Sequence, residues 1–286
     1  MSFKYAVCSY VALGHGIAET AAIVRTAGYR GIEWRVHPEG HVRPERLAED
    51  VAEARRAGEV EGLAPVCLTS YLPLLEPARA ERDVLAAAEL GAPRVRLLWP
   101  RYDGQASADA VFAAARRAMD ALAPVLERSG VAVVLETHRG SIVPTASAAK
   151  RLVEPYPPSL YAVLYDPPNT VTSGLEDPRY AVEILGPHLA HVQFKNVGWA
   201  RVDGVWRWTW TALDEGMIDW PPLLLRLAER GFDDWLSNEN FLLLSPDRRP
   251  GRGEVLETLP SYWADLDVPL VDRLRADLRW MAQAGG

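Results

Sequence analysis

Three acidic residues each close a short apolar run of the sequence. Glu136 follows the run VAVVL, Asp166 follows YAVLY, and Glu239 ends the run WLSNE. Runs of this kind are typical of strands that are buried on both faces in a parallel sheet covered by helices. The carboxyl ends of such strands meet at one mouth, so we expect these acids to approach one another, together with Glu33 of the run GIEWRV.

Several carboxylates packed together are costly unless something neutralises their charge. A divalent cation does this, and an oxygen-rich site favours hard ions such as Mg2+ or Mn2+. The alternative is that one or two of the acids pair with arginines such as Arg35, Arg96 or Arg139. The pattern favours the metal site and leaves the arginine pairs open.

The elements that must position these acids alternate regularly along the chain. We expect strands over 3–8, 31–36, 63–69, 94–99, 131–137, 161–166, 189–194 and 235–239. We expect helices over 16–28, 44–58, 77–90, 107–128, 146–153, 179–185, 219–230 and 270–281. Eight strands alternating with helices predict a single (β/α)8 TIM barrel of the α/β class. A doubly wound open sheet is the alternative, but no glycine-rich phosphate loop follows any strand.

No change in composition marks a second domain, so we expect one domain over residues 1–286. Two segments extend beyond the regular alternation. Asp203-Gly204 predicts a two-residue hairpin turn within a loop at about 197–218. A C-terminal loop and helix are expected at about 241–286.

Bulk properties restrict the function. The net charge is −7 and the pI is near 5.5, which argues against a nucleic-acid partner, because phosphates need a basic face. The start has no apolar signal segment and no run is long enough to span a membrane. Cys8 and Cys67 lack the spacing of a disulfide or zinc motif, which is typical of a reducing compartment. We therefore expect a cytoplasmic protein.

Six segments of the sequence resemble one family in matching order. They are GYRGIEWRV, VVLETHRG, YDPPNTVTSG, LAHVQFKNVG, LDEGMIDWPPLL and LSNENF. They resemble the xylose isomerase-like sugar phosphate isomerase/epimerase superfamily. The resemblance implies a TIM barrel that binds one divalent cation, often Mn2+, through Glu136, Asp166, Gln193 and Glu239. The superfamily includes ketose 3-epimerases, hydroxypyruvate isomerases, inosose dehydratases, 3-keto-glycoside lyases and abasic-site endonucleases, so the reaction stays open.

The chain departs from the superfamily pattern at two places. Asn169 stands where many epimerases carry histidine, and the usual His-x-His reads His191-Val192-Gln193. Gln193 lies at about the same depth in its strand as the acids do in theirs, whereas His191 comes one ~6.6 Å step earlier. We therefore expect Gln193 to be the metal ligand and His191 to lie deeper in the barrel. The endonuclease branch needs further histidines, and this chain has only six.

Other residues are candidate substrate contacts. His138 shares the direction of Glu136 and could bond a sugar oxygen, or only a neighbouring loop. Lys195 could stabilise an oxyanion or act as an acid, or be a solvated lysine. Asn169 and Glu33 are further candidates. Trp208, with Trp199, Trp206 and Trp210, could form a wall that stacks on a sugar ring, or pack against a partner subunit in a homo-oligomer.

The primary hypothesis is an isomerase or epimerase of a small polyhydroxy carbonyl compound, a carbohydrate substrate. Glu136 and Glu239 would be the catalytic pair that moves a proton through a metal-stabilised enediolate. The alternative is a dehydratase or lyase acting on a keto-sugar, keto-glycoside or inosose, with Lys195 or His138 assisting the leaving group. A third hypothesis is a sugar-binding barrel without catalysis.

Overall fold

Eight parallel strands close into a barrel in the computed structural model, which describes residues 3–244 and 267–286. Each strand pairs with the next along the chain, and the last pairs with the first. The strands are β1 (Lys4–Cys8), β2 (Gly31–Val36), β3 (Ala64–Pro73), β4 (Arg94–Leu98), β5 (Ala132–Glu136), β6 (Tyr161–Tyr165), β7 (Leu189–Phe194) and β10 (Trp235–Asn238). The predicted TIM barrel is confirmed.

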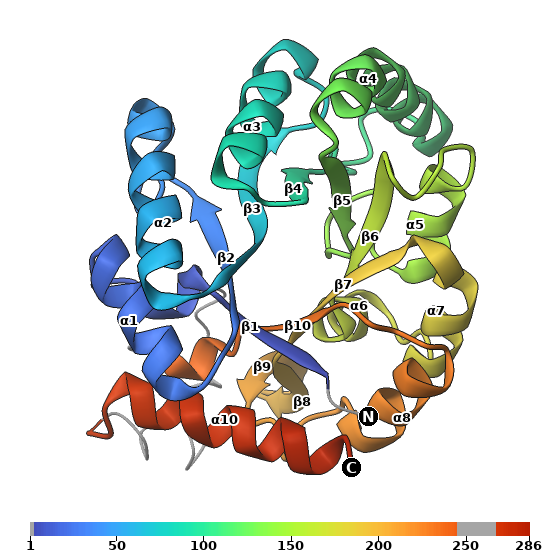
Figure 1. Ribbon diagram of the computed structural model, residues 1–286. Coiled ribbons are helices and arrows are strands. Elements are labelled where there is room, and N and C mark those ends of the chain that lie inside the picture. Colours follow the sequence, from blue (N-terminus) through green and yellow to red (C-terminus); the bar gives the residue numbers. More distant parts are fainter. Residues whose placement is uncertain (1–2, 245–266) are drawn as a thin grey trace.

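Helices surround the barrel in a ring (Figure 1). They are α1 (Ile17–Ala27), α2 (Leu47–Glu61), α3 (Pro77–Leu90), α4 (Ala108–Ser129), α5 (Ala146–Val153), α7 (Pro178–Leu185), α8 (Trp220–Glu229) and α10 (Leu270–Ala284). Short 3-10 helices occupy Ser9–Ala12, Pro44–Arg46, Gly186–His188 and Phe241–Leu243. Among the residues described, no helix combines the length and hydropathy that crossing a bilayer requires.

Two hydrophobic clusters explain why the strands are apolar on both faces. Val133 and Leu135 belong to the large cluster between the strands and the helices. Val134 belongs to a small cluster built from strand residues alone, which also contains Ala162 and Leu164 of β6. Because side chains alternate along a strand, Glu136 points to the same interior as Val134. The alternation of side chains along β5 thus places Glu136 at the mouth of the barrel.

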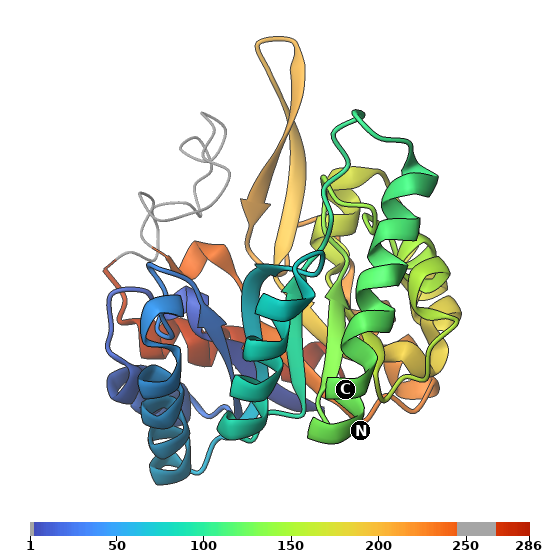
Figure 2. The same cartoon turned by 90° about the horizontal axis from the view of Figure 1, so that it is seen from above.

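An antiparallel hairpin follows β7. Its strands β8 (Asn196–Val202) and β9 (Val205–Thr211) are joined by Asp203 and Gly204, whose φ angles are 49° and 81°. Positive φ at both turn residues is what a tight hairpin requires, and the predicted turn is confirmed. Figure 2 shows the hairpin standing clear of the barrel, at the end away from both termini.

The structure differs from the expected elements at several places. Helix α2 continues past Gly58 and ends at Glu61, with Gly62 as its left-handed cap. Strand β3 continues to Pro73, four residues beyond the expected end. A short helix, α6 (Pro167–Ser173), was not among the expected helices, and two prolines begin it. Proline is well tolerated at the first helical positions, and the preceding Asp166 side chain caps the helix. Residues 245–266 of the expected C-terminal loop lie outside those described.

Candidate active site

Three acidic side chains meet at the carboxyl end of the barrel. Glu136 ends β5, Asp166 follows β6, and Glu239 follows β10. One carboxylate oxygen from each lies within 4.8 Å of the other two, and all three residues are buried. The fourth expected member, Glu33, does not belong to this group of three. We call Glu136, Asp166 and Glu239 the acid cluster.

Two buried cations face the acid cluster. The Arg96 guanidinium from β4 donates Nη2–H to Glu136 Oε2, so an arginine pair of the kind considered from the sequence does form. The Lys195 ammonium, just beyond β7, lies between Asp166 Oδ2 and Glu239 Oε2 and donates to both. Lys195 is therefore not a solvated loop residue. Three carboxylates against these two cations leave an excess of negative charge.

Asn169 joins two of the acids. Its Nδ2 donates to Glu136 Oε1 at 3.0 Å and to Asp166 Oδ2 at 2.8 Å. Its position is fixed by the start of α6, where the Asn169 backbone N–H donates to Asp166 Oδ1 at 2.9 Å. The side chain is buried. Asn169 thus holds Glu136 and Asp166 in place, in addition to any contact it makes with substrate.

The acids of the cluster have different proton affinities. Burial raises the pKa of Glu239 to about 7; Lys195 opposes this shift, while Glu136 and Asp166 add to it. Burial also raises the pKa of Asp166, against the pull of Lys195. For Glu136 burial is outweighed by the charge of Arg96, so the pKa of Glu136 is lowered. Two carboxyl groups in one site are therefore tuned in opposite directions, as in sites that separate acid and base roles.

Gln193 and His191 lie with Glu33. Gln193 Nε2 donates to Glu33 Oε1 at 2.9 Å, and His191 Nε2 lies 3.3 Å from Glu33 Oε2. Thr69 Oγ1 also donates to Glu33. As expected, His191 is fully buried and does not join the acid cluster. Glu33 is fully buried as well and orients Gln193, and its role as a substrate contact stays a prediction.

The residues present fit a divalent cation. The acid cluster supplies three carboxylates, which suit hard ions such as Mg2+ and Mn2+. Gln193 Oε1 is buried and has no hydrogen-bond partner among the described residues. A buried oxygen without a partner is costly, and coordination to a cation is one way to satisfy it. Three of the four ligands that the resemblance implies therefore lie together, and Gln193 stays a prediction as the fourth.

His138 lies beside the cluster and is partly buried. Its electrostatic influence adds to that of Arg96 in lowering the pKa of Glu136. His138 Nδ1 lies 2.7 Å from the carbonyl oxygen of Arg139. A carbonyl can only accept, so Nδ1 carries a proton and Nε2 is the nitrogen left for proton exchange. His138 therefore uses Nδ1 to bond its own loop, and its Nε2 is the nitrogen that a substrate contact would use.

Aromatic rings line one side of the cluster. The ring of Trp210, from β9, lies 4.9 Å from Trp208 and 4.6 Å from Phe241, centroid to centroid. The Lys195 ammonium lies 5.0 Å from the Phe241 ring and 5.7 Å from that of Trp210. The Arg139 guanidinium covers the Trp208 ring at 4.0 Å. These rings form an apolar wall beside a charged centre, which is how small-molecule sites are commonly built.

Sequence reasoning did not identify two residues of this region. Phe241 lies only two residues beyond Glu239, a spacing that places it at the same mouth. Tyr71 was expected in a loop, but β3 extends to Pro73 and carries Tyr71 with it. The Tyr71 ring lies 4.8 Å from the Arg35 guanidinium and 4.7 Å from that of Arg96. Tyr71 therefore supports the cation that pairs with Glu136.

Comparison with known proteins identifies the family. Residues 21–262 match the family described as xylose isomerase-like TIM barrel. The chain belongs to this family. Inosose dehydratase from Lacticaseibacillus casei is 29% identical over 118 residues, which cover 37% of this chain and 39% of that protein. The matched part of the chain therefore covers well under half the length of this curated relative.

Two solved structures align with nearly the whole chain. D-allulose 3-epimerase from Methylomonas sp. aligns with a TM-score of 0.73 at 17% identity, over 99% of this chain and 98% of that one. The probable 3-DHS dehydratase from Bacillus anthracis aligns with a TM-score of 0.72 at 16% identity, over 97% and 98%. At such identities the likeness establishes the fold alone, and the reaction must be inferred from the residues of the site.

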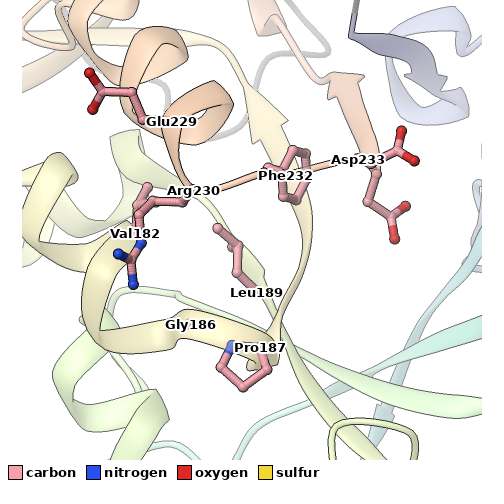
Figure 3. Close-up of a pocket in the computed structure, with 10 residues that line it drawn as sticks. Val182, Gly186, Pro187, Leu189, Glu229, Arg230, Phe232 and Asp233 are labelled. Carbon is pink, nitrogen blue, oxygen red and sulfur yellow. The ribbon is translucent and has the colours of Figure 1, made fainter.

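A cavity of about 490 Å³ lies at the other end of the barrel, where β7 and β10 begin. Figure 3 shows it between Leu189, Pro187 and the segment 229–234. TIM barrels place their chemistry at the carboxyl ends of the strands, and conserved features at the amino ends serve stability. We place no reaction in this cavity.

Proposed function

We propose that this xylose isomerase-like barrel is a divalent-metal-dependent isomerase or epimerase of a small polyhydroxy carbonyl compound, such as a sugar, keto-sugar or inositol derivative. The observation that carries the proposal is the acid cluster, with three buried carboxylates within 4.8 Å of one another. Its position at the carboxyl end of the barrel is where such folds bind substrates.

Glu136, Asp166, Gln193 and Glu239 would hold the cation, with Mn2+ or Mg2+ as the ion. When bound, the ion acts as a Lewis acid that polarises the substrate carbonyl. Asp166 and Glu239, which Lys195 contacts, would also hold the ion, so the ammonium would share these carboxylates with it. In the metal-free protein Asp166 and Glu239 raise the pKa of Lys195 against the effect of burial, so the side chain is a cation before an ion binds. Lys195 would therefore stabilise negative charge on a substrate oxygen and not deliver a proton.

Glu239 and Glu136 would divide the proton transfer. Burial raises the pKa of Glu239 to about 7 in the metal-free protein, and the charge of a bound cation would lower it, so Glu239 would act as the carboxylate that takes the proton from carbon. The Arg96 pair keeps Glu136 ionised, which suits a ligand that also accepts a proton transiently from carbon. Return of the proton to the opposite face of the same carbon gives an epimer, and return to the neighbouring carbon gives an isomer.

Polar and apolar groups beside the acids would orient the substrate. Asn169 and His138 would bond the hydroxyl groups nearest the acid cluster. Trp210 and Phe241 would cover the apolar face of the sugar ring, and Trp208 would extend that cover. This arrangement supports a neutral polyhydroxy substrate.

The second candidate is a dehydratase or lyase. The observation that favours it is His138, whose Nε2 could protonate a departing hydroxyl group after the same carbon-bound proton is removed. The partial match to inosose dehydratase points in the same direction. The two candidates share the first step and differ in whether a β-substituent leaves.

Proton NMR in D2O tests both candidates. The protein is first loaded with Mn2+, and the Mn2+ is then exchanged for Mg2+ before the measurement. A panel of keto-sugars and inososes would be incubated with wild type and Glu239→Gln. Deuterium at one carbon with the skeleton retained supports the isomerase, and an unsaturated product supports the dehydratase. Absence of exchange with every compound, in protein that has bound the metal, would rule out both enzymatic candidates.

A further inference from the structure

All four tryptophans of the hairpin lie on one face. In β8 and β9, Trp199 is opposite Trp208, Arg201 is opposite Trp206, and Val197 is opposite Trp210. Directly opposed side chains share a face, and so do residues two apart along a strand. The other face carries small and polar side chains, among them Ala200, Arg207 and Thr209. We call Trp210, Trp208, Trp199 and Trp206 the tryptophan row.

The tryptophan row runs from the acid cluster out to the hairpin tip. Exposure rises from 3% for Trp210, through half-buried Trp208, to 37% for Trp199 and 64% for Trp206. The inner end contacts Phe241 and Lys195, and Arg139 lies against Trp208. Arg139 follows β5, so the row faces the barrel mouth. Figure 2 shows how far the hairpin extends beyond the rest of the molecule.

We propose that the outer part of the tryptophan row binds a second pyranose ring, so that the substrate is a glycoside and not a single sugar. This inference rests on the proposed function, which places the reacting ring beside the acid cluster. Exposed indole rings in a contiguous row mark a binding surface. One face of a pyranose is lined by C–H bonds and its edge by hydroxyl groups. Arg139 covers the Trp208 ring, so the exposed rings for such a face are Trp199 and Trp206, and Arg201, opposite Trp206, supplies donors for the hydroxyl groups.

The row continues outward from the site along β9, where Trp210, Trp208 and Trp206 are two residues apart on one face. The two inner rings pack edge to face, with 4.9 Å between centroids and 71° between planes, so the rings open for stacking are the outer ones. A second copy of this chain could cover Trp206 at the tip. It would not account for the continuity of the row with Phe241 and Lys195 at the inner end. We therefore favour a ligand that begins in the site and continues outward.

Saturation-transfer NMR and tryptophan fluorescence titrations with non-reacting sugars test the inference. Cellobiose, maltose and lactose would each be compared with glucose and galactose. We expect at least one disaccharide to bind roughly tenfold more tightly than the monosaccharides, which is the effect of one good ring contact. Trp199→Ala and Trp206→Ala should remove that preference, whereas Arg207→Ala on the opposite face should keep it. Equal binding of all sugars, or variants that behave as wild type, would overturn the inference.

Two further readouts separate this inference from the proposed function. Trp206→Ala should leave deuterium exchange of a free keto-sugar unchanged and lower kcat/KM for its glycoside about tenfold. If exchange fails for every substrate while the disaccharide preference holds, the proposed function is wrong and the second-ring site stands. If Trp206→Ala turns a dimer into a monomer in sedimentation and leaves sugar binding unchanged, the row is a subunit contact and the inference is wrong.

Discussion

Replacing Arg96 with methionine should turn the ionised Glu136 side chain from a stabilising group into a destabilising one. Arg96 and Glu136 are 2% and 4% exposed, and Arg96 Nη1 also donates to the Ser70 carbonyl oxygen at 3.1 Å. Methionine keeps apolar volume but removes the charge. Breaking one partner of a buried ion pair costs roughly 3–5 kcal/mol, because the remaining charge is uncompensated. For a chain of this size that lowers Tm on the order of 6–10 °C.

The loss should depend on pH with a definite sign. In wild type the lowered pKa of Glu136 gives a stabilisation that is present above its ordinary value of 4.5 and lost as pH falls. In Arg96→Met, burial, Asp166 and Glu239 dominate and the pKa of Glu136 rises. Its contribution is then lost as pH increases. The Tm difference between wild type and Arg96→Met should therefore widen between about pH 5 and about pH 8.

Thermal unfolding by circular dichroism, with a chelator present throughout, measures this difference. The double variant Arg96→Met/Glu136→Gln is the matched control, because it leaves no unpaired charge and should recover most of the lost Tm. A Tm difference that is the same at both pH values, or a double variant less stable than Arg96→Met, would refute the assignment of Arg96 as the counter-charge of Glu136.

Three further predictions concern the acid cluster and the packing around Gly31 at the start of β2. Glu239→Gln should lower turnover at least about a hundredfold in protein that still folds, since a proton-transfer group is lost while Lys195 keeps Asp166 as its partner; near wild-type kcat would argue against its role. Mn2+ affinity should fall about tenfold per pH unit below the Glu239 pKa of about 7, because a proton must leave, and should be flat above it; Mn2+ titrations across this range check the slope. Gly31→Ala should cost roughly 1–3 kcal/mol in urea unfolding, because its Cβ would lie 2.6 Å from Val66 Cγ2 and 2.7 Å from Trp235 Cζ3, whereas Gly16→Ala meets open space; equal costs would contradict the packing.

The barrel and its acid cluster could be predicted because both follow from local pattern. Apolar strands with period two send Glu136 inward, and parallel closure brings it to Asp166 and Glu239. The same reasoning placed His191 below the acids, where it contacts Glu33.

The sequence could name Arg96 as a candidate partner of an acid but could not decide between partners, because long side chains leave their direction free. Lys195 was open between a solvated and a functional role, and it lies buried between Asp166 and Glu239. Helix α6 was not among the expected helices, although Asp166 before its two prolines is a suitable cap. The contribution of Tyr71 depended on four residues of additional strand at the end of β3, an element boundary that pattern does not determine.

Mn2+ binding followed by electron paramagnetic resonance tests the central claim most directly. We predict one Mn2+ per chain in wild type. Binding should be lost in Asp166→Asn and in Glu239→Gln, and a further substitution of Lys195 should not restore it. Glu59→Gln, which alters an exposed acid of α2, should bind as wild type does. Wild-type protein that binds neither Mn2+ nor competing Mg2+, or an Asp166→Asn variant that keeps full affinity, would contradict the assignment of this cluster as the metal site.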